Sequence, residues 1–196
     1  MCIRVLPYNV GMASETYLSV DIEASGPIPG EYSLLSLGAC VVGDTAQTFY
    51  VELKPITDNY IQSALEVSGL SLAELQKNGA APAAAMAEFE RWIQRVAPEG
   101  SRPVFVAFNA TFDWMFTHYY FIRFLGRDPF GISGLDIKAY YAGLTGAKWG
   151  ETTKSRLDKR FKSKRKHTHN ALDDAIEQAE VFEKMMAEAR GRAADG

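Results

Sequence analysis

Apolar positions repeat along the chain in two ways. Where they alternate with polar positions, or form a short unbroken run, they predict strands at residues 16–23, 32–42, 46–53, 103–108 and 134–137. Where they recur every three to four residues, they predict helices at residues 62–67, 71–77, 82–96, 110–125, 138–144 and 170–190. Three strands joined by hairpins therefore precede two strands that are reached through helices. This order predicts an α/β fold with a mixed sheet.

Turn and capping residues support several of these boundaries. Gly43 and Asp44 predict a hairpin turn between the second and third strands. Ser71 predicts a helix N-cap, because a glutamate follows three residues later. Asn170 predicts the N-cap of the last helix, and Asp173 stands at the third position of a capping box, which gives Asp173 a structural explanation.

The composition is that of one globular domain. The chain has 196 residues, of which 47% are hydrophobic and 23% charged. This excludes a disordered chain and a disulfide scaffold, and the apolar runs are too short to span a membrane. The isolated Cys2 and Cys40 indicate neither a disulfide framework nor a zinc site and favour a cytoplasmic setting. We expect a flexible extension at residues 1–15, a single domain at 16–190 and a polar tail at 191–196.

The formal net charge of −3 hides an uneven distribution. Residues 148–166 contain nine Lys and Arg side chains against Glu151 and Asp158, a local charge of +7, and the rest of the chain carries −10. We therefore expect a basic loop at residues 148–167. Such a loop is either a solvated surface stretch or a binding site for a polyanion.

Acidic residues stand at places where strands and helix starts are expected to be buried. Asp21 and Glu23 are two residues apart on the first strand, so they point to the same face. Burying two like charges together is costly without a cation, unless the strand has already reached solvent there. Asp113 falls in the first turn of a helix, where an acidic side chain also suits the helix dipole.

The start of the last helix adds a further acid and a histidine. Asp174 follows Asp173 on a different face of the helix, and His169 stands just before the helix. A lone histidine there would be an ordinary surface residue. Carboxylates from one strand and two helix starts, however, supply oxygen ligands for two divalent cations, and a histidine accepts a proton near neutral pH. Together they indicate phosphoryl transfer to water.

Three segments resemble, in order and spacing, the motifs of the DEDDh 3′–5′ exonucleases of the ribonuclease H-like superfamily. The segment VDIEASG carries Asp21 and Glu23, FNATFD carries Asp113, and HNALDDA carries His169 and Asp174. The segments KPI and VSGLS resemble the family between its first two motifs. The similarity spans about residues 16–186, all five catalytic positions are present, and the histidine separates the chain from the DEDDy branch.

This resemblance implies a ribonuclease H-like fold, a five-stranded mixed sheet flanked by helices, and a metal-dependent enzyme. Asp21, Glu23 and Asp174 would bind one Mg²⁺ or Mn²⁺ ion. Asp21 and the substrate phosphate would bridge to a second ion, Asp113 would assist through water, and His169 would be the general base. The enzyme would release nucleoside 5′-monophosphates from the 3′ ends of single-stranded RNA or DNA.

Positions that contact the substrate also follow from the resemblance and from the basic segment. The backbone of Ala24 and Ser25 would hold the terminal ribose, and Phe112 would pack near a base. The basic segment leads into the motif of His169 and should therefore lie near the active site. As a hypothesis, six of its side chains bind the nucleic-acid backbone, namely Lys159, Arg160, Lys162, Lys164, Arg165 and Lys166. Trp149 and Phe161 are candidates for stacking on bases.

Two alternative functions and the question of a homodimer remain open at this point. The same fold suits a non-catalytic nucleic-acid-binding module or a proofreading accessory of a polymerase. The five catalytic positions favour an enzyme, and we expect it to act alone because the sequence shows no appended partner domain. The helix at 112–124 carries seven aromatic side chains, more than one buried stripe requires, so its surplus predicts a base platform or a homodimer surface.

Overall fold

The computed structural model describes residues 14–165 and 168–194. Most of the expected extension, Cys2, Lys166 and His167 lie outside the described residues. The strands are β1 (Glu15–Ala24), β2 (Leu34–Val41), β3 (Asp44–Glu52), β4 (Arg102–Ala107) and β5 (Gly134–Asp136). The helices are α1 (Gln62–Ser68), α2 (Leu72–Asn78), α3 (Pro82–Val96), α4 (Ala110–Leu125), α5 (Ile137–Thr145) and α6 (Ala171–Ala194), with a short 3₁₀ turn η1 (Trp149–Glu151). Each expected element is present, although α6 extends four residues into the expected polar tail.

The sheet has the order β3-β2-β1-β4-β5. β1 pairs antiparallel with β2 and parallel with β4, so the sheet is mixed, as the sequence predicts. The hairpin turn falls on Val42 and Gly43, one residue before the expected position, because Val41 pairs with Asp44. Gly43 has a φ of 89°, a left-handed conformation that glycine adopts without steric cost.

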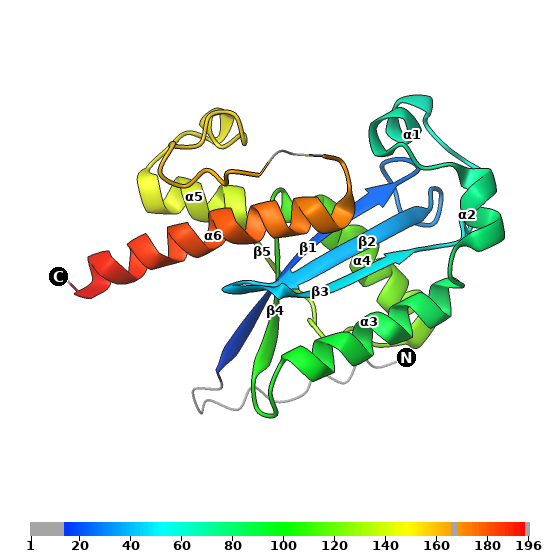
Figure 1. The fold of residues 1–196 in the computed structure, drawn as a ribbon, viewed down its shortest axis with the longest axis horizontal. Helices are drawn as coiled ribbons and strands as arrows, with labels where there is room; N and C mark the ends of the chain where they lie inside the picture. The colour runs from blue at the N-terminus through cyan, green and yellow to red at the C-terminus, as the bar shows by residue number, and fades with distance from the viewer. Residues whose placement is uncertain (1–13, 166–167, 195–196) are drawn as a thin grey trace.

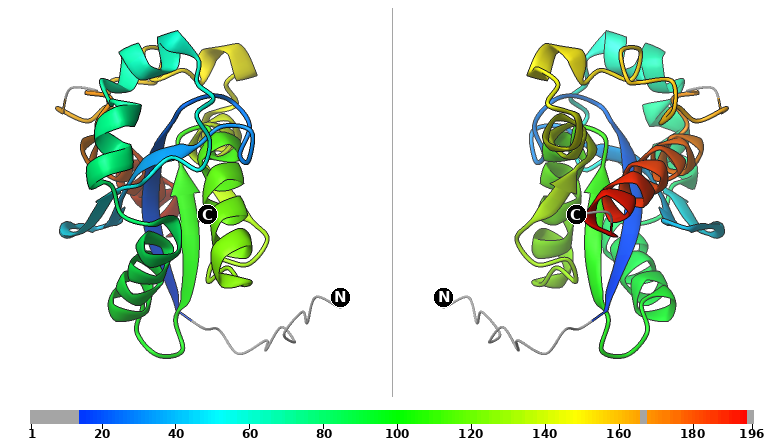
Figure 2. Two further views of the ribbon diagram at one scale, coloured as in Figure 1. Left: turned by 90° about the vertical axis from the view of Figure 1, so that its right-hand side faces the viewer. Right: turned by 90° about the vertical axis from the view of Figure 1, so that its left-hand side faces the viewer.

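Helices cover both faces of the sheet (Figures 1 and 2). Leu18, Val20 and Ile22 of β1 point into the larger core, which α3 and α4 close. The intervening residues point to the other face, where Ser19 donates a hydrogen bond to the carbonyl of Ala175 on α6 at 2.8 Å. Among the described helices, none has the length and apolar character of a membrane span.

The aromatic side chains of α4 serve mainly the core. Phe116, Tyr120 and Phe121 are completely buried. The Phe121 ring stacks on Phe89 of α3 with 5.6 Å between centroids, and the Tyr120 hydroxyl accepts a hydrogen bond from the Leu34 N–H at 2.8 Å. These contacts pack the middle of α4 against the sheet, about two turns after Asp113.

The basic segment packs against the domain through two of its apolar side chains. Leu157 and Phe161 are buried in a second core with α5 and α6. The Phe161 ring meets Tyr141 edge to face at 5.9 Å, so the expected stacking of Phe161 on nucleic-acid bases is wrong. The Trp149 ring is exposed, and the Lys138 ammonium lies 4.4 Å from its centroid. We call residues 148–165 the basic strap.

A close backbone contact sets the distance between α6 and the sheet. Gly38 on β2 has no side chain, and a Cβ there would lie 2.3 Å from the Ala171 carbonyl carbon and the Leu172 nitrogen. Gly38 is also the register partner of Asp21. The first turn of α6 therefore rests directly on the sheet beside Asp21.

The substitution Gly38→Ala should lower the free energy of unfolding by at least about 2 kcal/mol, because α6 must move away from the sheet. The matched control is Gly143→Ala inside α5, where a Cβ meets nothing within 4 Å. This control should leave stability unchanged or raise it by about 0.5 kcal/mol. Urea unfolding measures both, and equal stabilities of the two variants would contradict the close contact.

Candidate active site

Strand β1 delivers the first two carboxylates to the face that α6 covers. Asp21 and Glu23 are both half-buried, so the strand does not end in open solvent there. Glu23 pairs with Ser36, and the register shifts between Glu23 and Ala24. Such an irregularity at the end of a strand redirects the side chains beside it.

The start of α6 supplies the next carboxylate and the histidine. The completely buried carboxylate of Asp174 accepts hydrogen bonds from the backbone N–H groups of Thr168 at 3.1 Å and His169 at 3.0 Å. Asn170 caps the helix through the N–H groups of Leu172 and Asp173. The exposed Asp173 accepts a hydrogen bond from the Thr168 hydroxyl rather than closing a capping box.

Side chains from β1 and α6 come together at this point. One potential ligand atom each of Glu23, His169 and Asp174 lies within 4.8 Å of the others. Asp21 interacts electrostatically with Glu23, Asp113 and Asp174. Carboxylate oxygens and an imidazole nitrogen at this spacing suit a divalent cation, and they repel one another without it.

Asp113 reaches the same place from the opposite layer. It lies in the first turn of α4, as expected, and is 5% exposed. Its carboxylate accepts a hydrogen bond from the Ile22 N–H at 3.1 Å, between Asp21 and Glu23 along β1. A helix on one face of the sheet thus contributes an acid to a site on the other face.

Backbone strain coincides with the site. Among the described non-glycine residues, Asn109 and His169 are the two with positive φ, at 74° and 57°. Asn109 immediately precedes α4, and His169 lies two residues before the start of α6; both helices carry an acidic site residue. Such conformations cost free energy and persist where surrounding contacts enforce them. Asp136 enforces one of them, because its carboxylate accepts the Ala110 N–H at 2.6 Å.

Burial and mutual repulsion make the carboxylates hard to ionise without cations. Burial, followed by the charges of Asp174 and Asp113, raises the pKa of Glu23 from 4.5 to about 7. Burial raises the pKa of Asp113 to about 7, against the opposing effect of the Ile22 N–H. Burial and the three neighbouring acids raise the pKa of Asp21 well above its usual value. A bound divalent cation would reverse these preferences.

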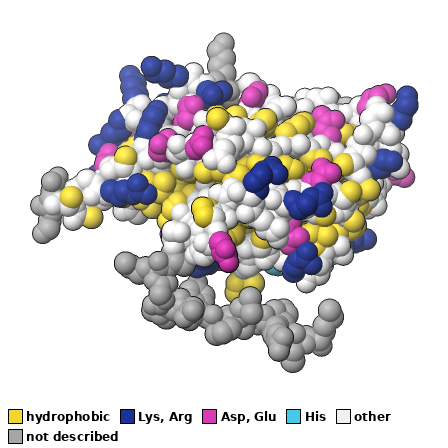
Figure 3. Space-filling view, turned by 60° about the horizontal axis from the view of Figure 1, so that its bottom comes forward, with side chains coloured by type: hydrophobic (Ala, Val, Ile, Leu, Met, Phe, Trp, Pro, Cys, Tyr) yellow, Lys and Arg dark blue, Asp and Glu magenta, His cyan; other side chains and the backbone are white. Residues whose placement is uncertain are grey.

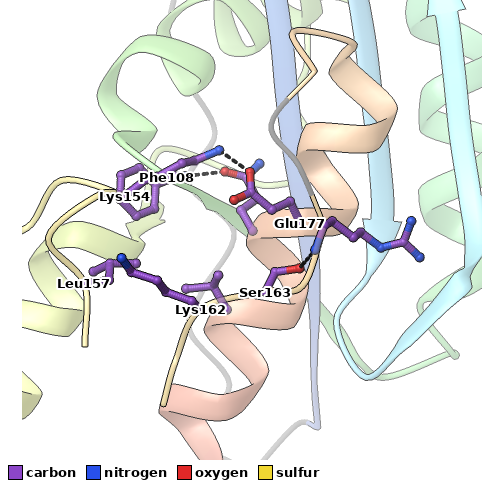
Figure 4. Close-up of a pocket in the computed structure, with 9 residues that line it drawn as sticks. Phe108, Lys154, Leu157, Lys162, Ser163 and Glu177 are labelled. Carbon is purple, nitrogen blue, oxygen red and sulfur yellow. Dashed lines mark hydrogen bonds and ion pairs between the residues drawn. The ribbon is translucent and has the colours of Figure 1, made fainter. Parts of the chain in front are cut away.

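A lysine of the basic strap stands beside the carboxylates. The Lys154 ammonium lies 2.6 Å from a carboxylate oxygen of Glu177, one turn after Asp174 on α6, and 5.6 Å from the centroid of the Phe108 ring (Figure 4). Its positive charge opposes part of the rise in the pKa of Asp21 and Asp113. The same residues border a cavity of about 160 Å³ between the strap and α6.

The residues expected to contact the sugar and base are largely engaged in the protein. Ser25 is completely buried, its hydroxyl donates to the Asn59 carbonyl at 2.8 Å, and its N–H donates to the Ser33 carbonyl. Ala24 is also buried, and the half-buried Phe112 packs on Phe116 with 5.3 Å between centroids. Substrate contacts by Ala24, Ser25 and Phe112 stay predictions, and the hydrogen bonds of Ser25 give it a structural role.

The basic side chains of the strap divide into two groups. Several are held by the protein itself. Arg165 pairs with Glu180 at 2.8 Å, Arg160 pairs with Asp158 and Glu188 at 3.3 Å, and the Lys162 ammonium donates to the Ser155 carbonyl. Lys159 and Lys164 are exposed. On the face that Figure 3 shows, Lys and Arg lie among Asp and Glu rather than in one uniform patch.

Comparison with known proteins identifies the family of the chain. The sequence model of the 3′–5′ exoribonuclease Rv2179c-like domain matches residues 16–186. The chain belongs to this family. It is therefore a 3′–5′ exonuclease. The 3′–5′ DNA exonuclease Cap18 of Escherichia coli is 49% identical over 168 residues, which cover 86% of this chain and 90% of Cap18.

Solved structures confirm the ribonuclease H-like fold of the family. The nuclease domain of 3′hExo, a DEDDh family member bound to rAMP, superposes with a TM-score of 0.71 at 13% identity. The alignment covers 90% of this chain and 94% of that domain. Escherichia coli exonuclease I in complex with a dA16 oligonucleotide superposes with a TM-score of 0.67 at 20% identity, over 93% of this chain and 42% of exonuclease I.

Several residues that build the site are not evident from the motifs. Four residues contact motif residues directly, namely Gly38, Asp136, Lys154 and Gln178. Glu177 pairs with Lys154. A glycine inside an apolar strand signals a close backbone approach, and positions three and four residues after Asp174 share its helix face. These signals could have indicated the glycine and the two α6 residues. Lys154 contacts α6 only through the fold, and its spacing carries no signal.

Without metal ions, the exonuclease should lose stability as the pH rises from about 4.5 to about 7. Across this range the unfolded chain has released the protons of Glu23 and Asp113, whereas the folded protein retains them. Each group lowers the free energy of unfolding by at most about 1.4 kcal/mol per pH unit, less for the half-buried Glu23. Denaturant unfolding in EDTA at several pH values measures this slope.

Added Mn²⁺ should raise stability, most strongly at and above pH 7, because the cation binds the ionised carboxylates. The variant Asp113→Asn should reduce the slope in EDTA, and Asp173→Asn, which changes an exposed neighbour of the site, should not. A metal-free stability that increases from pH 4.5 to 7 relative to Asp113→Asn would contradict the assignment.

Proposed function

We propose that the protein removes nucleotides one at a time from the 3′ ends of single-stranded nucleic acid and releases nucleoside 5′-monophosphates. The observation that carries the proposal is the convergence of Glu23, His169 and Asp174 within 4.8 Å, with Asp21 and Asp113 in electrostatic contact. Gathering buried and half-buried carboxylates in this way is costly, because the charged forms repel one another. The family membership supports the same chemistry.

The carboxylates would hold two divalent cations, Mg²⁺ or Mn²⁺. Asp21, Glu23 and Asp174 would bind the first, and Asp21 with the substrate phosphate would bind the second, with Asp113 assisting through water. Bound there, the cations would supply Lewis acidity and neutralise charge at the scissile phosphate. The raised pKa values of Glu23 and Asp113 support this, because a cation beside these carboxylates would offset the repulsion and burial that oppose their ionisation.

His169 would take the proton from the attacking water. Its side chain is exposed, whereas its backbone N–H is fixed to the Asp174 carboxylate at 3.0 Å. The backbone of His169 is therefore anchored while its imidazole reaches solvent, which suits a group that accepts a proton and passes it on.

The substrate is proposed to be a single strand, with DNA preferred. Cap18, the relative with 49% identity, is named a DNA exonuclease, and the family is named for exoribonucleases. The exposed Lys159 and Lys164 would attract phosphates, and the exposed Trp149 would stack on a base. A cytoplasmic location, and a homodimer through the outer side of α4, stay predictions.

Activity assays test the catalytic roles directly. Asp21→Asn and Asp174→Asn should abolish nearly all hydrolysis, and His169→Ala should slow it about 100- to 10,000-fold. EDTA should stop the reaction, and Mg²⁺ or Mn²⁺ should restore it. The substrates are 5′-labelled oligonucleotides of one sequence, as RNA and DNA, single- and double-stranded, with products separated by length and identified as 5′-monophosphates.

The matched control is Asp173→Asn, which removes the acid next to Asp174 and should retain activity because Asp173 points to Thr168. Full activity of Asp174→Asn would refute the site. Binding of oligonucleotide without hydrolysis by the wild-type chain would favour the non-catalytic module. Activity that requires an added polymerase would favour the proofreading accessory.

The strap predicts a salt-dependent contribution to binding. Lys159→Ala with Lys164→Ala should weaken oligonucleotide binding and reduce the slope of log Kd against log salt by about 0.7 for each phosphate that the protein no longer neutralises. Replacing all six proposed basic residues should weaken binding further. The control is Arg91→Ala with Arg95→Ala on α3, which are exposed; α3 lies at the lower right of Figure 1 and the strap at the upper left. Equal slopes for both double variants, measured by fluorescence anisotropy in EDTA, would exclude the strap.

A further inference from the structure

A buried amide links the two strands that border the site. Gln178 on α6 is completely buried and lies one turn after Asp174. Its Nε2 donates a hydrogen bond to the Val20 carbonyl at 2.8 Å, and its Oε1 accepts the Phe108 N–H at 2.6 Å. One side chain thus satisfies a carbonyl at the end of the paired part of β1 and an N–H just after β4.

The amide stands where the parallel ladder stops. The last register pair between β1 and β4 is Ser19 with Val106. Continued by two residues, this register would bring Asp21 opposite Phe108, and the next main-chain hydrogen bond would join Val20 to Phe108. The Gln178 amide replaces that bond, so the strands are separated by the width of a side chain.

This separation admits Asp113. The next N–H on the same edge of β1 belongs to Ile22, and the Asp113 carboxylate accepts it at 3.1 Å. Gln178 and Asp113 therefore occupy successive places along the edge that β4 has left. A carboxylate from the α4 layer reaches the α6 face because the strands part here.

The chemistry of an amide suits this position closely. One end must donate to a carbonyl and the other must accept from an N–H, and both groups are buried. A leucine of similar size would leave both backbone groups without this partner, and a glutamate would set a carboxylate oxygen against the Val20 carbonyl. A buried polar group that loses its partner costs about 1–3 kcal/mol, so the strands would shift.

We propose that Gln178 is a positioning residue for the hydrolysis, and this rests on the proposed function. It sets the distance between β1 and β4, and through that distance it places Asp113 relative to Asp21 and Asp174. One amide on α6 therefore holds together the three segments that carry these acids. Gln178 contacts the backbone of these segments and takes no part in the bond-making step.

Steady-state kinetics of Gln178→Leu and Gln178→Glu test the proposal in the full chain. Both variants should lower kcat about 10- to 100-fold while KM for the oligonucleotide stays within threefold, because the acids are displaced and the binding surface is not. The matched control is Tyr120→Phe, which removes another buried bond from a side chain to a backbone N–H, at Leu34. The kcat of this control should stay within twofold of the wild-type value, even where its Tm falls as far as that of the Gln178 variants.

Hydrogen exchange supplies a readout that needs no activity. Exchange at the Phe108 amide should accelerate at least tenfold in Gln178→Leu and stay unchanged in Tyr120→Phe. A wild-type chain without nuclease activity would refute the proposed function, and the exchange result would still judge the link between the strands. Unchanged Phe108 exchange, or a kcat loss in Gln178→Leu that Tyr120→Phe matches at equal Tm, would overturn the positioning role.

Discussion

The contact between the first turn of α6 and Gly38 sets the geometry of the whole site. Because a Cβ at Gly38 would meet backbone atoms at 2.3 Å, the helix lies as close to the sheet as two backbones allow. At that distance Asp174 reaches the carboxylates of β1, Ser19 reaches the Ala175 carbonyl, and Gln178 reaches between the strands. A helix resting higher, on side chains, would bring none of these groups within hydrogen-bonding distance.

The site gathers groups that oppose folding. Like charges buried together raise one another's pKa, and the protein offsets part of this repulsion with fixed donors rather than with counter-charges alone. The Ile22 N–H serves Asp113, and two backbone N–H groups serve Asp174. The repulsion that these donors do not offset favours the binding of cations. The same arrangement that lowers stability therefore accounts for the metal dependence expected of the family.

Much of this architecture could be predicted from the sequence, because its signals are local. Alternation along β1 puts Asp21 and Glu23 on one face, and the cap at Asn170 marks the start of α6. The spacing of Gln178 from Asp174 indicates its helix face, but its role has no local signal, because its two partners lie on strands whose separation is a tertiary property. Phe161 differs from its prediction for the converse reason: an aromatic among lysines looks exposed until the fold places it against Tyr141.

The basic strap shows why charge along a sequence does not translate directly into a binding surface. Its positive residues face an acidic helix, and Glu177, Glu180 and Glu188 each accept one of them. These pairs are within the protein, so they reduce the field available to a polyanion. They also fix the segment that leads to His169, which a mobile loop could not position. On the proposed function, the attraction for nucleic acid would come from the exposed lysines and from cations held by the carboxylates, and substrate binding and metal binding would be interdependent.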